Sequence, residues 1–194
     1  MISEFLTRGT AAGNLSATQT AQTGQQFLRF HLLPDTTAML PVQQITEVLT
    51  ISIAQVVPIP HMPAEVMGIY NWRGEILWLV DLGQLLGLAS YQQLNSRSHY
   101  TTIVIHNSHQ VSGKQQTSNQ KTGKKMLGLL ISRVEDMEWC NPDLIQSPPV
   151  SAVTPNLVPF LRGYWSKSNS EILVVLDGDS IIAGMPQPQV AETI

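Results

Sequence analysis

Apolar residues along the chain fall in short runs that alternate with polar residues or end at Pro, Gly, Asn or Asp, and this pattern predicts a mainly β protein. Segment 43–49 fits either a short strand or a turn, whereas the prolines of 56–63 require an extended backbone. Pro41 indicates an edge strand or a bulge, and the strand over 126–137 is predicted to bend near 135–136. Strands are predicted over residues 26–33, 38–42, 67–72, 75–80, 100–106, 126–137, 161–165 and 171–177.

The fold is organised around the two runs 67–72 and 75–80, which predict a β-hairpin with Gly74 in its turn. Glycine supplies the positive φ that a tight turn often requires. Because the second run is apolar on both faces, we expect a central strand of its sheet and not an edge. Arg73 is a lone cation in this apolar stretch. Since a charged side chain is costly to bury unpaired, Arg73 is expected either to meet a carboxylate or to point toward a partner.

The second strand of this hairpin recurs later in the chain. Residues 75–81 (EILWLVD) return as 171–177 (EILVVLD), and each copy follows an Arg-Gly pair and precedes an apolar doublet and a glycine. Asp81 is suited to cap a short helix over 82–86, which Gly87 would end. Two copies of one strand, turn, strand and cap predict two similar small barrels. Chance similarity is the alternative, since such apolar runs are common.

Composition limits the partners of this fold. The chain of 194 residues is 43% hydrophobic, enough for a substantial core, but only 13% charged, about half the usual fraction. Gln, Ser, Thr and Asn replace the missing charge, which suggests a surface that contacts other proteins. The net charge of −3 argues against a nucleic-acid or anionic-membrane partner, which would require a basic surface. The single cysteine, Cys140, excludes an intramolecular disulfide.

Three polar segments are predicted to lie outside the ordered fold. Residues 1–23 have the composition of a disordered tail, residues 185–194 form a polar tail, and the insert 107–125, with four lysines, predicts a long mobile hairpin loop. No apolar run approaches the roughly 18 residues of a membrane span, and the N-terminus lacks the pattern of a signal peptide. We therefore expect a cytoplasmic protein whose ordered domain spans 24–184.

Candidate catalytic and metal-binding residues form no recognisable constellation. His106 and His109 have no thiolate or clustered carboxylate near them in sequence, so no metal site is predicted. Neither Gly-Lys pair of the insert has the spacing of a phosphate-binding loop. Cys140 is expected to be structural, although a spatially close histidine would make it a candidate nucleophile. No cofactor is predicted, and nothing in the sequence favours an enzyme.

The segment GIYNWRGEILWLVDL resembles the hallmark of CheW-type coupling proteins, in which Gly, two hydrophobic residues, Asn-x-Arg-Gly and a hydrophobic run lead to Asp-Leu. The segments QFLRFHL, AMLPVQQITEVL, TTIVIH, MLGLLISRVEDM and EILVVLD match other strands of that family in order, over about residues 24–184. The resemblance implies two intertwined five-stranded SH3-like β-barrels with short helices, packed around a shared hydrophobic core. It also implies a non-enzymatic adaptor between a CheA-type histidine kinase and a methyl-accepting chemoreceptor.

The resemblance further implies where these partners bind. Ile45 and Glu47 match the segment linked to receptor binding, Arg73 matches the motif arginine, and Gly128 matches a glycine of the same surface. Kinase docking is expected on an apolar patch of the second barrel, to which Met137 is assigned.

Alternatives to this interpretation stay open. Arg73 would instead brace the hairpin if it paired internally with Glu47 or Glu75, and the two roles are compatible. A barrel that binds another protein or single-stranded nucleic acid outside chemotaxis is a second hypothesis, although the acidic charge disfavours nucleic acid. A hydrolase that uses Cys140 is a third.

The chain departs from the family pattern at three motif positions, occupied here by Trp78, Gly83 and Ser132, and its insert 107–125 is longer than usual. These departures indicate a divergent paralogue, for which a receptor of a phototaxis or pilus-motility system is a candidate partner. They leave the predicted fold unchanged, and we expect no nucleic-acid binding and no insertion into the membrane.

Overall fold

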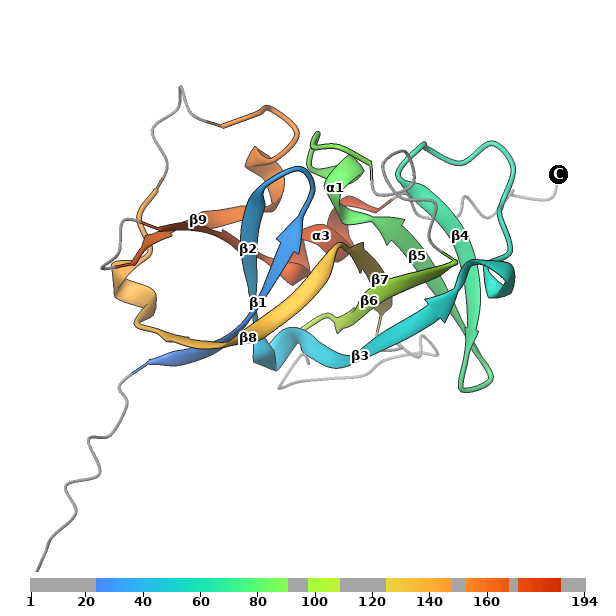
Figure 1. Ribbon diagram of the computed structural model, residues 1–194, viewed down its shortest axis with the longest axis horizontal. Helices are drawn as coiled ribbons and strands as arrows, with labels where there is room; N and C mark the ends of the chain where they lie inside the picture. Colours follow the sequence, from blue (N-terminus) through green and yellow to red (C-terminus); the bar gives the residue numbers. More distant parts are fainter. Residues whose placement is uncertain (1–23, 91–97, 109–124, 148–152, 168–170, 186–194) are drawn as a thin grey trace, which may run out of the picture.

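The computed structural model describes residues 24–90, 98–108, 125–147, 153–167 and 171–185, which fold into two five-stranded β-sheets with short helices. The strand order is β8-β1-β2-β10-β9 in the first sheet, called barrel A below, and β3-β6-β7-β5-β4 in the second, called barrel B. Figure 1 shows the two barrels side by side, with helix α3 (Gly178–Gly184) between them.

The strands of each barrel come from separate parts of the chain. Neighbouring strands are antiparallel, except that β10 is parallel to β2 and β5 is parallel to β7. Barrel A contains β1 (Gln25–Leu32), β2 (Thr36–Pro41), β8 (Arg133–Cys140), β9 (Leu161–Ser166) and β10 (Ile172–Leu176). Barrel B contains β3 (Ile45–Ser52), β4 (Val66–Trp72), β5 (Glu75–Asp81), β6 (His99–His106) and β7 (Met126–Ile131). The connections include α1 (Leu82–Leu85) and the 3-10 turns η1 (Val42–Gln44), η2 (Ile53–Gln55), η3 (Pro142–Leu144) and η5 (Val158–Phe160).

Each sheet closes through a short segment that leaves one edge strand and reaches the other. After β3, turn η2 leads to Val57, whose backbone pairs with that of Ile69 in β4. After β8, turn η3 leads to Gln146, which pairs in the same way with Tyr164 of β9. Because β3 and β4 are the two edges of one sheet, and β8 and β9 those of the other, these bridges turn each sheet into a small barrel. The predicted fold of two barrels is thereby confirmed.

The sequence repeat corresponds to a structural repeat. Each copy forms the second strand of a hairpin, β5 or β10, and pairs in parallel with another strand of its own barrel. Each ends at an aspartate that caps the next helix. Asp81 accepts a hydrogen bond from Gln84 N at 3.1 Å, and Asp177 accepts one from Asp179 N at 3.0 Å. The shared strand and cap therefore reflect one architecture used twice.

The largest hydrophobic core lies between the two barrels. Fully buried side chains from both sheets meet there, including Phe30 of barrel A and Ile103 of barrel B. Smaller cores fill the barrels themselves, one around Tyr100 in barrel B and one around Phe27 and Cys140 in barrel A. This arrangement confirms the shared core that the family resemblance implies.

Barrel B is a continuous insertion within barrel A. The chain passes from β2 through η1 into the five strands of barrel B and returns to barrel A at Ser132, between β7 and β8. The single strand predicted over 126–137 is therefore two strands, because the chain changes sheets at Ser132. A register shift does occur further along, where β8 places Glu135 and Asp136 opposite the single residue Arg29 of β1.

Two other strand predictions need correction. The strand over 75–80 is central as expected, since β5 lies between β7 and β4, but it is not buried on both faces throughout, because Ile76 is exposed. Pro41 marks neither an edge nor a bulge, because β2 lies between β1 and β10 and pairs regularly with β1. Pro41 is instead the last residue of β2, where the chain enters η1. Segment 43–49 proves to be both turn and strand, with η1 ending at Gln44 and β3 beginning at Ile45.

Some predictions concern segments outside the described residues, namely the tail 1–23, nearly all of the insert 107–125 and nearly all of the tail 185–194. Strands β6 and β7 pair up to His106 and Met126, so the insert connects the two strands of a hairpin. In the described part of the chain, none of the helices has the length and hydropathy of a membrane span.

Candidate functional site

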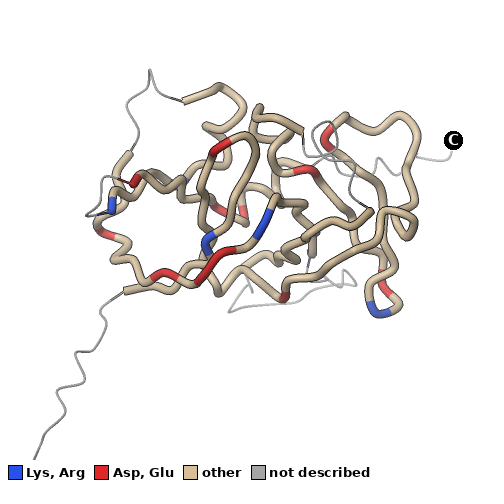
Figure 2. Tube along the Cα trace, in the orientation of Figure 1, with Lys and Arg blue, Asp and Glu red and all other residues tan. Residues whose placement is uncertain are grey.

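The tip of the β4–β5 hairpin presents Arg73 to solvent. Arg73 (φ 53°) and Gly74 (φ 86°) form the turn, and Gly74 N donates a hydrogen bond to Asn71 Oδ1 at 3.0 Å. Gly74 thus has the positive φ that the sequence predicts. The Arg73 side chain is 69% exposed, and Figure 2 shows cationic and acidic positions together at this tip.

Behind the tip, Arg73 and Trp72 both contact Glu47 of β3, and we call these three residues the hairpin cluster. Arg73 Nη2 lies 2.6 Å from Glu47 Oε2, and Trp72 Nε1 donates a hydrogen bond to Glu47 Oε1. The guanidinium carbon lies 5.0 Å from the centre of the Trp72 ring, which itself belongs to the core of barrel B. Arg73 therefore pairs internally with Glu47, as the bracing alternative requires, and still exposes most of its side chain.

The hairpin cluster also joins the two edge strands of barrel B, since Glu47 lies on β3 and Trp72 on β4. In barrel A the corresponding edges are joined by Lys167, which follows β9 and contacts Glu138 of β8. The two barrels thus hold their edges together with different chemistry, an indole and a guanidinium in barrel B and an ammonium group in barrel A.

Ile45 and Gly128, the other residues assigned to receptor binding, are less exposed than Arg73. Ile45 is partly buried at the start of β3 and packs against the core between the barrels. Gly128 is buried in β7, and a Cβ there would lie 2.5 Å from Leu79 Cδ2 and 3.0 Å from Thr102 Cγ2. Gly128 is therefore buried, and replacing it would act through the packing of β7.

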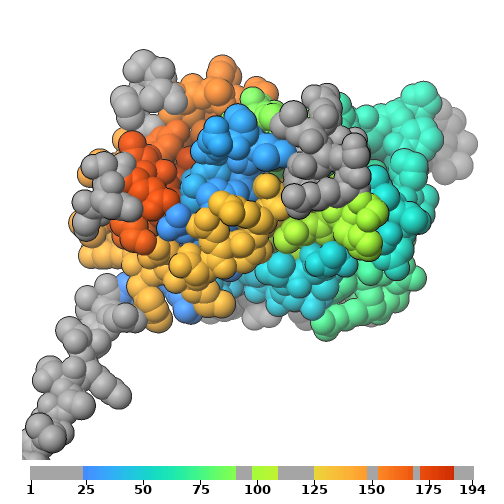
Figure 3. All heavy atoms as spheres, viewed as in Figure 1, coloured from blue at the N-terminus to red at the C-terminus, as the bar shows by residue number. Residues whose placement is uncertain are grey.

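An apolar strip lies on β8, an edge strand of barrel A. Met137, which the sequence assigns to kinase binding, is 57% exposed, and Trp139, two residues further along, is 46% exposed. Figure 3 shows the yellow segment that includes β8 on the visible face of the molecule. Trp139 was not predicted as a site residue, although its alternation with Glu138 and Cys140 is typical of a strand with one exposed face.

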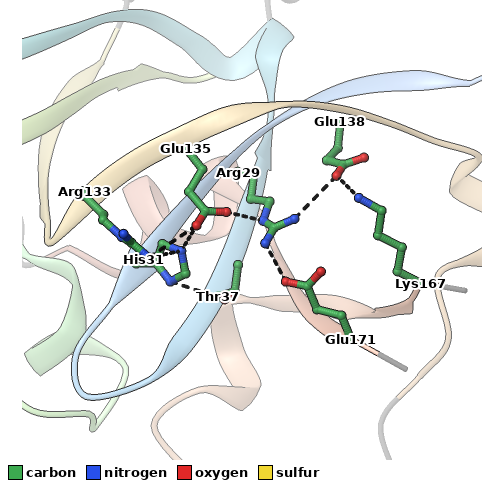
Figure 4. A network of polar contacts seen from close by, with 8 residues as sticks. All are labelled: Arg29, His31, Thr37, Arg133, Glu135, Glu138, Lys167 and Glu171. Atoms are coloured by element: carbon green, nitrogen blue, oxygen red, sulfur yellow. Dashed lines mark hydrogen bonds and ion pairs between the residues drawn. The ribbon is translucent and has the colours of Figure 1, made fainter. Parts of the chain in front are cut away.

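Charged groups surround Arg29 of β1, behind this strand (Figure 4). The guanidinium lies 2.5 Å from Glu135, 2.5 Å from Glu171 and 3.5 Å from Glu138, and its side chain is only 14% exposed. Lys167 shares Glu138, so the network connects β1, β8 and the β9–β10 hairpin. Three carboxylates thus compensate a largely buried cation that would be costly to bury unpaired.

His31 lies at the other end of this network, as Figure 4 shows. Its Nε2 contacts Glu135 Oε1 and lies 3.0 Å from Arg133 Nη2, while its Nδ1 lies 3.3 Å from Thr37 Oγ1. The hydrogen bond with His31 lowers the pKa of Glu135, and the charges of His31, Arg29 and Arg133 lower it further, although burial raises it. The ionised Glu135 therefore ties β8 to β1 close to the point where the chain leaves barrel B.

Cys140 is not placed to act as a nucleophile. Its side chain is buried inside barrel A, and its Sγ lies 3.4 Å from the backbone oxygen of Asn141, to which it donates. Burial raises the pKa of the thiol, which keeps it protonated, so the structure does not support the hydrolase alternative. Within the described ranges, no three His, Cys, Asp or Glu side chains group in a way that could hold a metal ion.

Comparisons with known proteins agree with this architecture. The model of the CheW-like domain family matches residues 26–184. Among solved structures, the crystal structure of the scaffolding protein TtCheW from Thermoanaerobacter tengcongensis is similar, with a TM-score of 0.60 and 19% sequence identity. The similarity covers 79% of this chain and 89% of that chain, and at this identity it concerns the fold alone. No curated protein matches the chain.

Proposed function

The chain belongs to the CheW-like domain family, and we propose on this basis that it is a non-enzymatic scaffold in a chemosensory array that controls motility. It would couple a CheA-type histidine kinase to a methyl-accepting chemoreceptor. Two barrels around a shared core form a body that can present separate surfaces to two partners. The observation that carries the proposal is the hairpin cluster, which holds an exposed guanidinium in a defined position on an apolar hairpin.

We assign receptor binding to the surface around Arg73. Because Glu47 and Trp72 already orient the guanidinium, binding to an acidic or polar group of a receptor helix would order little additional side chain. Ile76 is exposed on the same hairpin, opposite Asn71, and supplies apolar area beside the cation. Ile45 would add to this surface through its exposed part.

We assign kinase binding to the strip formed by Met137 and Trp139. Exposed methionine and tryptophan side chains are typical of the central part of protein interfaces. The strip belongs to barrel A and the hairpin cluster to barrel B, so the two partners would bind different barrels.

The proposed location is the cytoplasm, at the periphery of membrane-bound receptor arrays, where both proposed partners act. The domain that carries the function would span 24–184. The unusual residues Trp78, Gly83 and Ser132 make a phototaxis or pilus-motility receptor a candidate partner.

The test is a reconstituted array that contains the purified chain, a CheA-type kinase and the cytoplasmic fragment of a chemoreceptor held on vesicles. Arg73→Glu is expected to weaken co-sedimentation with the receptor at least about tenfold, because it reverses the charge at the proposed contact. Arg162→Glu is the control, since it makes the same charge reversal at an exposed arginine on β9 of barrel A. Equal receptor binding by the two variants, or no kinase stimulation by the wild type, would refute the proposal.

A further inference from the structure

Gln44 lies at one of the two described points where the chain passes between the barrels. It is the last residue of η1, which connects β2 of barrel A to β3 of barrel B. Its exposed fraction is 7%, so its amide group is shielded from water. A buried amide must find its hydrogen-bond partners within the protein. The partners of Gln44 therefore show what the chain contacts just before barrel B begins.

The side chain of Gln44 reaches the start of α3, the helix that follows β10 of barrel A. Its Oε1 accepts a hydrogen bond from Gly178 N at 2.9 Å. Its Nε2 donates to Asp177 Oδ1 at 3.1 Å and to Asp179 Oδ2 at 3.3 Å. One amide group thus binds a backbone N–H and two carboxylates at the start of α3, the helix that follows β10 of barrel A.

Further contacts make this arrangement specific. A Cβ on Gly178 would lie 2.9 Å from Gln44 Oε1 and 3.2 Å from Gln44 Cδ, so the amide fits against a residue without a side chain. Asp179 Oδ1 also accepts a hydrogen bond from Ser108 N at 2.7 Å, just after β6, which ties barrel B to α3 at a second point. Burial raises the pKa of Asp177, but hydrogen bonds from Gln44, from Ser180 and from the backbone lower it, so it remains an acceptor.

We propose that Gln44 is a positioning residue that sets the orientation of barrel B on barrel A. Strand β3 begins at the next residue, and Glu47 of the hairpin cluster is the third residue of that strand. The orientation of the hairpin cluster relative to the strip on β8 would therefore depend on this amide. Only that last step rests on the proposed function, in which a scaffold must hold two partners at a fixed geometry.

Gln44→Glu tests the proposal because it keeps the shape of the side chain. It replaces the amide nitrogen, which donates to two carboxylates, by a negatively charged oxygen that cannot donate. We expect the repulsion to displace the side chain and change the orientation of barrel B on barrel A about their shared core. Residual dipolar couplings of backbone amides measure this directly. One alignment tensor should fit both barrels in the wild type, whereas each barrel of Gln44→Glu should require its own.

The matched control is Gln43→Glu, which makes the same change at the preceding residue of η1. Gln43 is exposed and its Oε1 accepts a hydrogen bond from Gln25 Nε2 at 3.0 Å, so no carboxylate of α3 is involved. This variant should keep the single tensor of the wild type. If Gln44→Glu also keeps that tensor, the proposal is wrong.

A double variant covers the case in which Gln44→Glu does not fold. In Gln44→Glu/Asp179→Asn the new amide can donate to the new carboxylate, and its oxygen can still accept from Ser108 N. The repulsion from Asp177 remains, so partial recovery is expected. Recovery of folding with the wild-type tensor would support the proposal. Failure of the double variant to improve on the single one would overturn it.

A functional readout separates positioning from partner contact. In the reconstituted array, Gln44→Glu should bind the receptor fragment and the kinase separately with unchanged affinity but stimulate the kinase at least about fivefold less. Weaker binding to either partner alone would contradict a positioning role. Failure of the proposed function would look different, because the wild type would then not stimulate the kinase, whereas the dipolar couplings need no partner.

Discussion

Gly68 and Gly163 occupy corresponding positions, where β4 and β9 approach the segments that close the two barrels. A Cβ on Gly68 would lie 2.2 Å from the backbone oxygen of Val57, and one on Gly163 would lie 2.7 Å from that of Gln146. These are the two segments whose backbones bridge to β4 and β9. Each barrel therefore closes at a point where the backbones are too close for a side chain to fit between them.

Replacing Gly68 by alanine is expected to lower the free energy of unfolding by about 3 kcal/mol, because the methyl group would push β4 away from Val57. Gly74→Ala is the control for backbone conformation alone. Gly74 also has a positive φ, 86°, but no atom lies within 4 Å of a Cβ there, so a loss of about 1 kcal/mol is expected. Urea denaturation measures both, and equal losses would show that close approach is unimportant at Gly68.

The sequence predicted two barrels, but it could not predict which segments close them. The repeat of 75–81 at 171–177 is a contiguous pattern, so both hairpins and both caps were predicted correctly. Closure depends instead on Val57 and Gln146, which lie in irregular segments after a 3-10 turn and carry no period. Contacts between edge strands distant in the sequence arise only once the sheets have curled.

Swapping the charges of Glu47 and Arg73 distinguishes a bracing role of Arg73 from a role in partner binding. Arg73→Glu is expected to lower the free energy of unfolding by about 1 kcal/mol, because the pair with Glu47 is largely solvent-exposed on the arginine side. The double variant Glu47→Arg/Arg73→Glu should recover part of that stability, since opposite charges again face each other. It should not recover receptor binding, because the group presented to the receptor remains negative.

Chemical denaturation and receptor co-sedimentation, applied to the same samples, check this prediction. Recovery of both properties by the double variant would mean that Arg73 acts through bracing alone. Recovery of neither would point to Trp72, whose indole N–H loses its acceptor when Glu47 is replaced.

For the site residues too, the sequence predicted the residues but not their contacts in space. Glu47 and Arg73 were each singled out from the sequence, but their contact depends on the closure of barrel B, which also buries Trp72 beneath them. Gly128 was assigned to a surface although its segment, MLGLLI, is apolar on both faces and so indicates a buried strand. The local apolar pattern therefore predicts the buried position of Gly128 in β7.

Stability should depend on pH through Glu135. Its pKa is lowered in the native state, so its contribution is complete above the unfolded-state value of about 4.3 and is lost as the pH falls through the native pKa. The difference in free energy of unfolding between wild type and Glu135→Gln should therefore shrink between neutral pH and about pH 3. Denaturation at a series of pH values measures it, with Glu75→Gln, at an exposed glutamate, as the control. A difference that is independent of pH would mean that Glu135 acts through packing.

Trp139 provides the sharpest test of the kinase surface, because its large aromatic side chain is 46% exposed on the strip. Trp139→Ser is expected to weaken kinase binding about tenfold or more, as loss of a large aromatic side chain at an interface centre does. Stability should change little, since the side chain is already nearly half exposed. Leu144→Ser is the control, because Leu144 is at least as exposed but lies on η3, outside the strip. Calorimetric titration with the isolated kinase measures both variants. Equal weakening by both variants would mean that the interface extends beyond β8. Unchanged binding by Trp139→Ser would mean that the kinase binds another face of the scaffold.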